Sequence, residues 1–295
     1  GGLHAGTNVM ALASGDMSLG SITTASDGRT YLADAQMYLD NGGDEDNFDP
    51  NAVLALAPVA TDGSITINGP VTTGVFQAAA GTNFTASAIT APFFSDEHLV
   101  GGINVSAGGT ASINGTWTGA GIQVTSNDID ITETGLIDGS VSLVSTNATQ
   151  TVIGDGIGGG GYQLSDAEFD RIIGAGVISV ATDAGLGANP QMIIGDLSID
   201  ATNPGNEFGT EYQFATYDVD DEAGAVGSIR VVGEMVFTNA ENDDVFLTTE
   251  TFELDAETGL LALTGSGTDP AGSLQIEATH IHVAGGEVLD QLAEY

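Results

Sequence analysis

The chain has 295 residues, with 41 acidic side chains against 3 arginines, so its formal net charge is −38; it contains neither lysine nor cysteine. Three arginines cannot neutralise a phosphate backbone or hold the chain on an acidic bilayer, which excludes nucleic-acid binding and a polybasic membrane anchor. The missing residue types exclude disulfide scaffolds, thiol catalysis, cysteine zinc sites and Schiff-base chemistry.

The composition predicts a folded chain, because 41% of the residues are hydrophobic and only 15% are charged, whereas disordered chains combine high charge with low hydrophobicity. No apolar run is long enough for a transmembrane helix. A strongly acidic chain suits a salty or calcium-containing exterior, where its self-repulsion is screened. The opening residues show neither an initiator Met nor a signal peptide, so we expect a processed piece or a segment of a longer protein.

Residues 34–58 are too acidic for a regular strand and predict a protruding loop. A repeat follows, in which triplets of alternating apolar and polar residues begin every nineteen residues. The five triplets are Ile65-Thr66-Ile67, Phe84-Thr85-Ala86, Ile103-Asn104-Val105, Ile122-Gln123-Val124 and Val141-Ser142-Leu143. Alternation is a strand signal, and turn formers such as Asn114-Gly115 and Asp138-Gly139 separate the triplets.

A nineteen-residue unit cannot bury its own apolar face, whereas stacked units can, each strand pairing with its counterpart in the next coil. The sequence therefore predicts an all-β fold, a right-handed parallel β-helix (β-solenoid) with coils of about 19 residues. An antiparallel sandwich or barrel is the alternative, although it does not require constant spacing.

Loop insertions are also predicted at 157–173, 203–226 and 238–249. Within the first of these, Ser165 and Glu168 form a capping-box pattern that predicts a short helix over about 166–173. The nineteen-residue interval recurs between Ile178-Ser179-Val180 and Leu197-Ser198-Ile199. Strands are predicted again at 229–231, 252–254, 274–276 and 281–283, and residues 286–295 are predicted to form a terminal helix or cap. We expect no domain boundary, so residues 1–295 form one continuous segment.

Three acidic clusters are candidate calcium sites, because calcium takes six to eight oxygen ligands. They contain Asp40, Asp44, Glu45, Asp46 and Asp49; Asp218, Asp220, Asp221 and Glu222; and Glu241, Asp243 and Asp244. None matches an EF-hand or the calcium-binding nonapeptide repeat. Solvated acidic loops are the simpler interpretation, and no cofactor is required.

His280 and His282 share one face of a predicted strand and could begin a zinc or copper site, but the sequence offers no third ligand. The alternation places both imidazoles outward and Ile281 and Val283 inward. Arg230 is likewise predicted on an outer face. We expect no catalytic residues, since no nucleophile elbow or cluster of basic and acidic side chains is recognisable.

A resemblance to a known family is spread over five stretches of the chain. They are GSVSLVSTNATQTVIGDG (139–156), GYQLSDAEFDRI (161–172), MIIGDLSID (192–200), GSIRVVGEM (227–235) and LTGSGTDPAGSLQIEATHIHVA (263–284). These stretches are similar to the filamentous-haemagglutinin-like surface proteins of Gram-negative bacteria, particularly the giant β-strand-repeat proteins of sphingomonad-type alphaproteobacteria. The resemblance implies a secreted right-handed β-helix at the cell surface and carries over no catalytic residue. The chain departs from that family in lacking the secretion domain with its Asn-Pro-Asn motif; Asp49-Pro50-Asn51 is the nearest match.

The sequence therefore predicts a structural subunit or shaft segment of an extracellular fibre or adhesin. Its partners would be copies of itself, or adjacent coils of a longer chain, stacked head to tail. One alternative is a module that binds a glycan or a cell surface through the loops at 34–58, 157–173 and 203–226. The other is a β-helical lyase or hydrolase acting on polysaccharides, which the scarcity of cations disfavours.

Overall fold

The computed structural model describes residues 2–6, 9–13, 15–25, 28–34, 63–92, 102–147, 150–159, 161–174, 176–183, 189–200, 209–217, 225–238, 240, 243–265, 272–283 and 287–290. The chain is nearly all-β and dominated by parallel strand pairing, an arrangement consistent with a β-solenoid. It divides into two compact units, Gly1–Val141 and Ser142–Tyr295. The chain passes from the first to the second within β13 (Leu136–Ser145).

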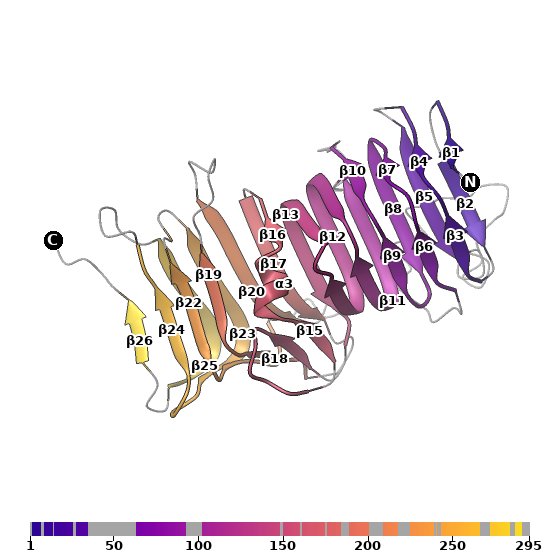
Figure 1. Cartoon of the computed structure of the whole chain (residues 1–295). Coiled ribbons are helices and arrows are strands. Elements are labelled where there is room, and N and C mark those ends of the chain that lie inside the picture. The colour runs from indigo at the N-terminus through magenta and orange to yellow at the C-terminus, as the bar shows by residue number, and fades with distance from the viewer. Residues whose placement is uncertain are drawn as a thin grey trace. The chain divides into compact units, whose positions relative to one another are not determined.

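Three parallel ladders build the first unit, and their strands lie side by side (Figure 1). The first ladder contains β1 (Leu3–His4), β4 (Ile22–Thr23), β7 (Val71–Thr72), β10 (Ile89–Ala91) and the start of β12 (Thr116–Ile131). The second contains β2 (Val9–Ala13), β5 (Arg29–Asp34), β8 (Val75–Ala80), and parts of β11 (Ile103–Ile113) and β12. The third contains β3 (Met17–Leu19), β6 (Ile65–Ile67), β9 (Phe84–Ala86), and the ends of β11 and β12.

The second unit also contains three parallel ladders. One contains β17 (Gly176–Asp183), β20 (Thr210–Tyr217), and the first halves of β23 (Asp244–Leu254) and β25 (Ser273–Val283). Another contains β14 (Thr151–Ile153), β18 (Gln191–Ile194), β21 (Ser228–Val231), and the second halves of β23 and β25; β15 (Tyr162–Leu164) also pairs with β14. The last contains β19 (Leu197–Asp200), β22 (Glu234–Thr238), β24 (Leu260–Leu263) and β26 (Glu287–Asp290).

Alternate side chains enter the core in strands such as β11, β12, β20 and β23, which explains why apolar residues recur there at every second position. In the first unit Phe84 lies between Phe76 and Trp117, with ring centroids 6.0 and 5.8 Å away. In the second unit Phe169 stacks on Phe214 at 6.2 Å. These rings are buried and fill the space between the ladders.

The nineteen-residue spacing is confirmed at two steps of the first unit, where Ile65 pairs with Phe84 and Ile103 pairs with Ile122. Phe84 does not pair with Ile103, however. It pairs with Ala111, twenty-seven residues on, and Ile103 pairs back to Phe76. Residues between β10 and β11 lengthen this coil, so the 84-to-103 interval joins two different ladders.

The interval between 178 and 197 is also coincidental. Ile178 pairs with Tyr212, whereas Leu197 pairs with Met235 in a different ladder. Coils of the second unit are therefore longer than the predicted 19 residues. The strands of these longer coils still pair in parallel register.

Three of the predicted loops contain strands, and the 157–173 loop contains β15 and β16 (Ile172–Ile173). Residues 210–217 of the 203–226 loop form β20, and residues 244–249 of the 238–249 loop begin β23. The loop prediction is wrong there because acidic neighbours obscured the alternation: Tyr212, Phe214, Val245 and Leu247 are buried. The loop at 34–58 lies outside the described residues, apart from Asp34 at the end of β5.

The capping box is confirmed, but the helix it begins is shorter than predicted. Ser165 caps α3 (Asp166–Phe169), accepting from the Glu168 N–H, while the Glu168 carboxylate accepts from the Ser165 N–H at 2.9 Å. Residues 172–173 return to a strand, β16. The terminal helix is wrong for residues 287–290, which pair with β24 as β26 because β24 offers them an open edge. Residues 291–295 lie outside the described part of the chain.

Within the described residues, no helix is long and apolar enough to span a membrane.

Candidate functional site

Two columns of inward side chains run through the second unit and end at β25. Each column takes one residue from each of four successive strands in parallel register. They are Met192, Ile229, Phe252 and Ile281, and Ile194, Val231, Leu254 and Val283. The first three members of each column are buried, whereas Ile281 is 54% exposed and Val283 is 47% exposed. Core positions thus reach the surface where the ladder ends.

One backbone edge of β25 is unpaired in the described part of the chain, on the same strand whose apolar side chains are exposed. Over its eleven residues, β25 pairs with β23 alone in the described part of the chain. Leu274 and Ile276 are half-buried, although their partners Val245 and Leu247 are fully covered. An open strand edge that carries core-type side chains is a template for another strand.

Sequence reasoning placed Ile281 and Val283 correctly on the inward columns, but it did not predict their exposure. The spacing of apolar residues in 245–254 recurs in 274–283, but this repeat does not tell whether another coil covers the strand. Such a repeat marks a coil built like an interior one. It carries no polar residue at the core positions that would mark a capping coil.

The imidazoles of His280 and His282 lie on the outward side of β25, as predicted. Both are exposed, and His282 stands in register with Glu253 while His280 stands opposite Thr251. Among the described residues, no three histidine, aspartate or glutamate side chains are grouped so that they could hold a metal ion. A metal site at this pair therefore stays a prediction without structural support.

Most of the calcium candidates fall outside the described residues: Asp40, Asp44, Glu45, Asp46, Asp49, Asp218, Asp220, Asp221, Glu222 and Glu241. The two described carboxylates serve the backbone. Asp243 is buried and accepts from the Thr210 N–H, and Asp244 accepts from the Ser273 N–H at 3.2 Å. Each carboxylate therefore ties neighbouring coils together.

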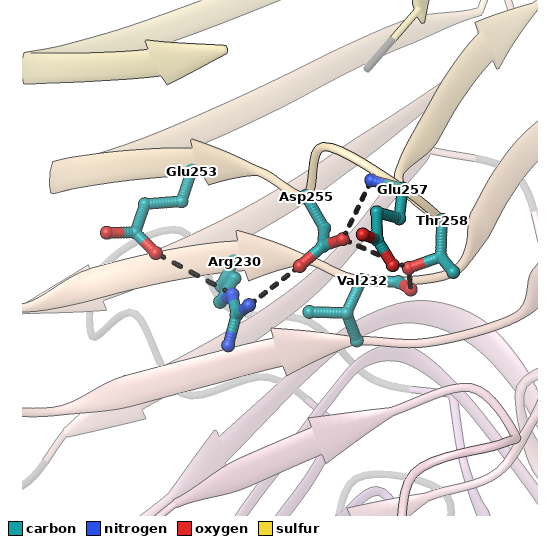
Figure 2. A network of polar contacts seen from close by, with 6 residues as sticks. All are labelled: Arg230, Val232, Glu253, Asp255, Glu257 and Thr258. Carbon is teal, nitrogen blue, oxygen red and sulfur yellow. Dashed lines mark hydrogen bonds and ion pairs between the residues drawn. The ribbon is translucent and has the colours of Figure 1, made fainter. Parts of the chain in front are cut away.

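Arg230 lies on the outer face of β21, as predicted, between two carboxylates of the following coil (Figure 2). Its Nε lies 3.6 Å from Glu253, and its Nη2 donates to Asp255 at 2.7 Å. The Glu257 backbone N–H and Arg230 lower the pKa of Asp255. Arg230 and Glu253 are about half exposed and Asp255 is less so, and the network links two successive coils as a local clamp.

A pocket of about 460 Å³ opens at a corner of the second unit. Four carboxylates line it, those of Asp155, Asp196, Glu234 and Glu257, and its remaining lining is glycine, aliphatic residues and Thr258. Its lining contains no cation, so an anionic polysaccharide would be repelled. The glycan-binding and polysaccharide-cleaving alternatives stay predictions that this geometry does not strengthen.

A scan with protein-family models gives no match for this chain, and searches of curated proteins and of solved structures give no significant match either.

Proposed function

We propose that this chain is a structural β-solenoid segment, a right-handed parallel β-helix, of an extracellular bacterial fibre or adhesin, and that it assembles end to end through its open coil. The supporting observation is the emergence of the core columns at β25, where Ile281 and Val283 are half-exposed although their counterparts in earlier coils are buried. A strand added there would bury them and satisfy the free backbone groups of β25.

The mechanical basis is the parallel ladder. Each added coil repeats the hydrogen bonds and apolar contacts of the coil beneath it, so the same interaction can be made at every junction. Covering the remaining surface of Ile281 and Val283 contributes roughly 2 kcal/mol, about a thirtyfold change in association constant. The net charge of −38 opposes side-by-side aggregation.

The extracellular location is part of the proposal. It is supported by the absence of cysteine, by the acidic composition and by the resemblance to filamentous-haemagglutinin-like surface proteins. A solution with salt or calcium screens the acidic faces and leaves the short-range contacts of the coil ends to act.

The test is to place negative charges at the exposed ends of the two core columns, where they should prevent another coil from docking. The double variant Ile281→Glu/Val283→Glu should stay monomeric in sedimentation velocity and form no filaments in electron micrographs, whereas the original chain should form end-joined filaments. Because both positions are exposed, the circular dichroism spectrum should not change.

The matched control is Ile173→Glu, which charges another exposed aliphatic residue, 44% exposed in β16. This control should assemble like the original chain. Equal assembly of the double variant, or an original chain that remains monomeric at every concentration and salt level, would contradict the proposal.

A further inference from the structure

The inward residues of β25 follow a spacing that the structure uses elsewhere in its interior. In β25 they are Leu274, Ile276, Ala278, Ile281 and Val283. The same steps of two, two, three and two separate Ile122, Val124, Ser126, Ile129 and Ile131 in β12, and Val245, Leu247, Thr249, Phe252 and Leu254 in β23. Both sets are buried, and β23 is paired on both of its edges. Strand β25 therefore has the pattern of an interior strand.

The first coil follows a second spacing that is also found in the interior. Its inward residues are Val9, Ala11 and Ala13 of β2, and Met17 and Leu19 of β3. Steps of two, two, four and two separate them, as they separate Ile103, Val105, Ala107, Ala111 and Ile113 in β11. In the described residues, β2 pairs only with β5 and β3 only with β6, so this coil also presents an open edge.

The structure shows that these two spacings fit each other. Strands β11 and β12 pair in parallel along their length, Ile103 with Ile122 and Ile113 with Ile131, and one shift between Ala107 and Thr110 absorbs the extra residue. A corresponding shift, with the extra residue now on the following coil, would bring the first coil into register with β25.

We propose, building on the function above, that the partner of β25 is the first coil of a second copy of this chain, docked in one register. In that register Leu274 pairs with Val9, Ile276 with Ala11, Ala278 with Ala13, Ile281 with Met17 and Val283 with Leu19. The two exposed aliphatic side chains of β25 then lie against Met17 and Leu19, two residues of the core columns of the first unit.

Polar side chains complement each other along the same junction. His282 comes opposite Ser18, and His280 comes near Asp16; all four side chains are exposed before docking. An imidazole N–H can donate to the Asp16 carboxylate, which otherwise accepts from the Ser64 N–H at 2.9 Å. Neither histidine has to be buried, so the junction requires no desolvation of a charge.

Docking brings β1 of the incoming copy to the level of β26, because β1 precedes β2 in the chain and β26 follows β25. Only one strand can hold this position. Strand β1 pairs with β4 over two residues, whereas β26 pairs with β24 over four. We therefore expect β1 of the incoming copy to detach from β4, so that β26 can occupy its position.

The absence of cysteine allows the register to be tested by cross-linking. Adjacent parallel strands lie about 4.8 Å apart, within the range of about 4.4–6.8 Å that a disulfide spans between Cα atoms. The variant Ser18→Cys/His282→Cys should give a ladder of disulfide-linked oligomers on a non-reducing gel after mild oxidation. Deletion of residues 1–6 in this variant should leave the ladder intact.

The matched control is Ser18→Cys/Glu277→Cys, since Glu277 is also exposed on β25 but lies five residues, about 16 Å, from the proposed contact. Its oligomer ladder should be lost. Filaments without a Ser18–His282 cross-link, or equal cross-linking in the control, would overturn this register and leave end-to-end assembly standing. Absence of both filaments and cross-links would overturn both proposals.

Discussion

Tyr212 shows how the fold changes the chemistry of one side chain. Its phenol belongs to β20, it is buried, and its ring lies 5.2 Å from that of Phe237. Burial, with a smaller contribution from the Asp243 carboxylate, raises the pKa of Tyr212 to about 12. The folded chain therefore holds the phenol protonated where an unfolded chain would ionise it.

This shift predicts a loss of stability in alkaline solution. Because the pKa of Tyr212 is higher in the folded state than its ordinary value of 10.0, the stabilisation is complete below pH 10 and is lost as the pH rises to about 12. The free energy of unfolding from urea titrations at several pH values should show this decline. Tyr212→Phe should remove part of this alkaline decline in the free energy of unfolding. Tyr31→Phe, which alters a tyrosine of the other unit, should leave the decline unchanged.

Buried threonines occupy equivalent positions in the neighbouring strands β20 and β23. Thr216 and Thr249 are buried, and their hydroxyls share a hydrogen bond of 2.7 Å between β20 and β23. Thr249 also donates to the Gly227 carbonyl at 3.2 Å. These bonds satisfy polar groups at the corner and hold successive coils in register.

Thr249→Val keeps the shape of the side chain and removes its hydroxyl. We expect the free energy of unfolding to fall by about 1–3 kcal/mol, because the Thr216 hydroxyl loses a buried partner. Chemical denaturation measures the change. Thr248→Val, one residue away on the opposite side of the strand, should change it by no more than about 0.5 kcal/mol. Equal effects would show that the hydroxyl of Thr249 plays no special part.

The elements also show what sequence can predict about this fold. Alternation identifies strands and their inward face even for Ile281 and Val283, since it depends on local geometry alone. Constant spacing predicts the partner of Ile65 but not that of Phe84, because an insertion between β10 and β11 changes the length of the coil. The open edge at β25 could not be predicted, because burial depends on which strand comes next, not on the strand itself.

At the scale of the whole molecule, charge is the dominant property. With a formal net charge of −38, repulsion acts on every coil, and salt reduces its range from about 30 Å at 0.01 M to about 8 Å at 0.15 M. We expect the midpoint of thermal unfolding to rise over this range of sodium chloride.

Calcium chloride at matched ionic strength separates screening from specific binding. An equal rise in the two salts means that screening alone acts. An additional rise at low millimolar calcium would support the calcium sites predicted at Asp40–Asp49 and Asp218–Glu222, because a ligand that binds only the folded state stabilises it.

The arrangement of the arginines has a consequence for digestion by proteases. Trypsin-like proteases cut after lysine or arginine and need an extended, unpaired segment to enter their cleft. Arg230 lies in β21 and pairs on both sides, with Ile193 of β18 and Glu253 of β23, whereas Arg29 begins β5 and pairs with Val75 of β8. Only Arg171, in the turn after α3, lies outside a strand. We therefore expect such proteases to cut the folded chain after Arg171 first, because the parallel ladders hold Arg29 and Arg230 in strands.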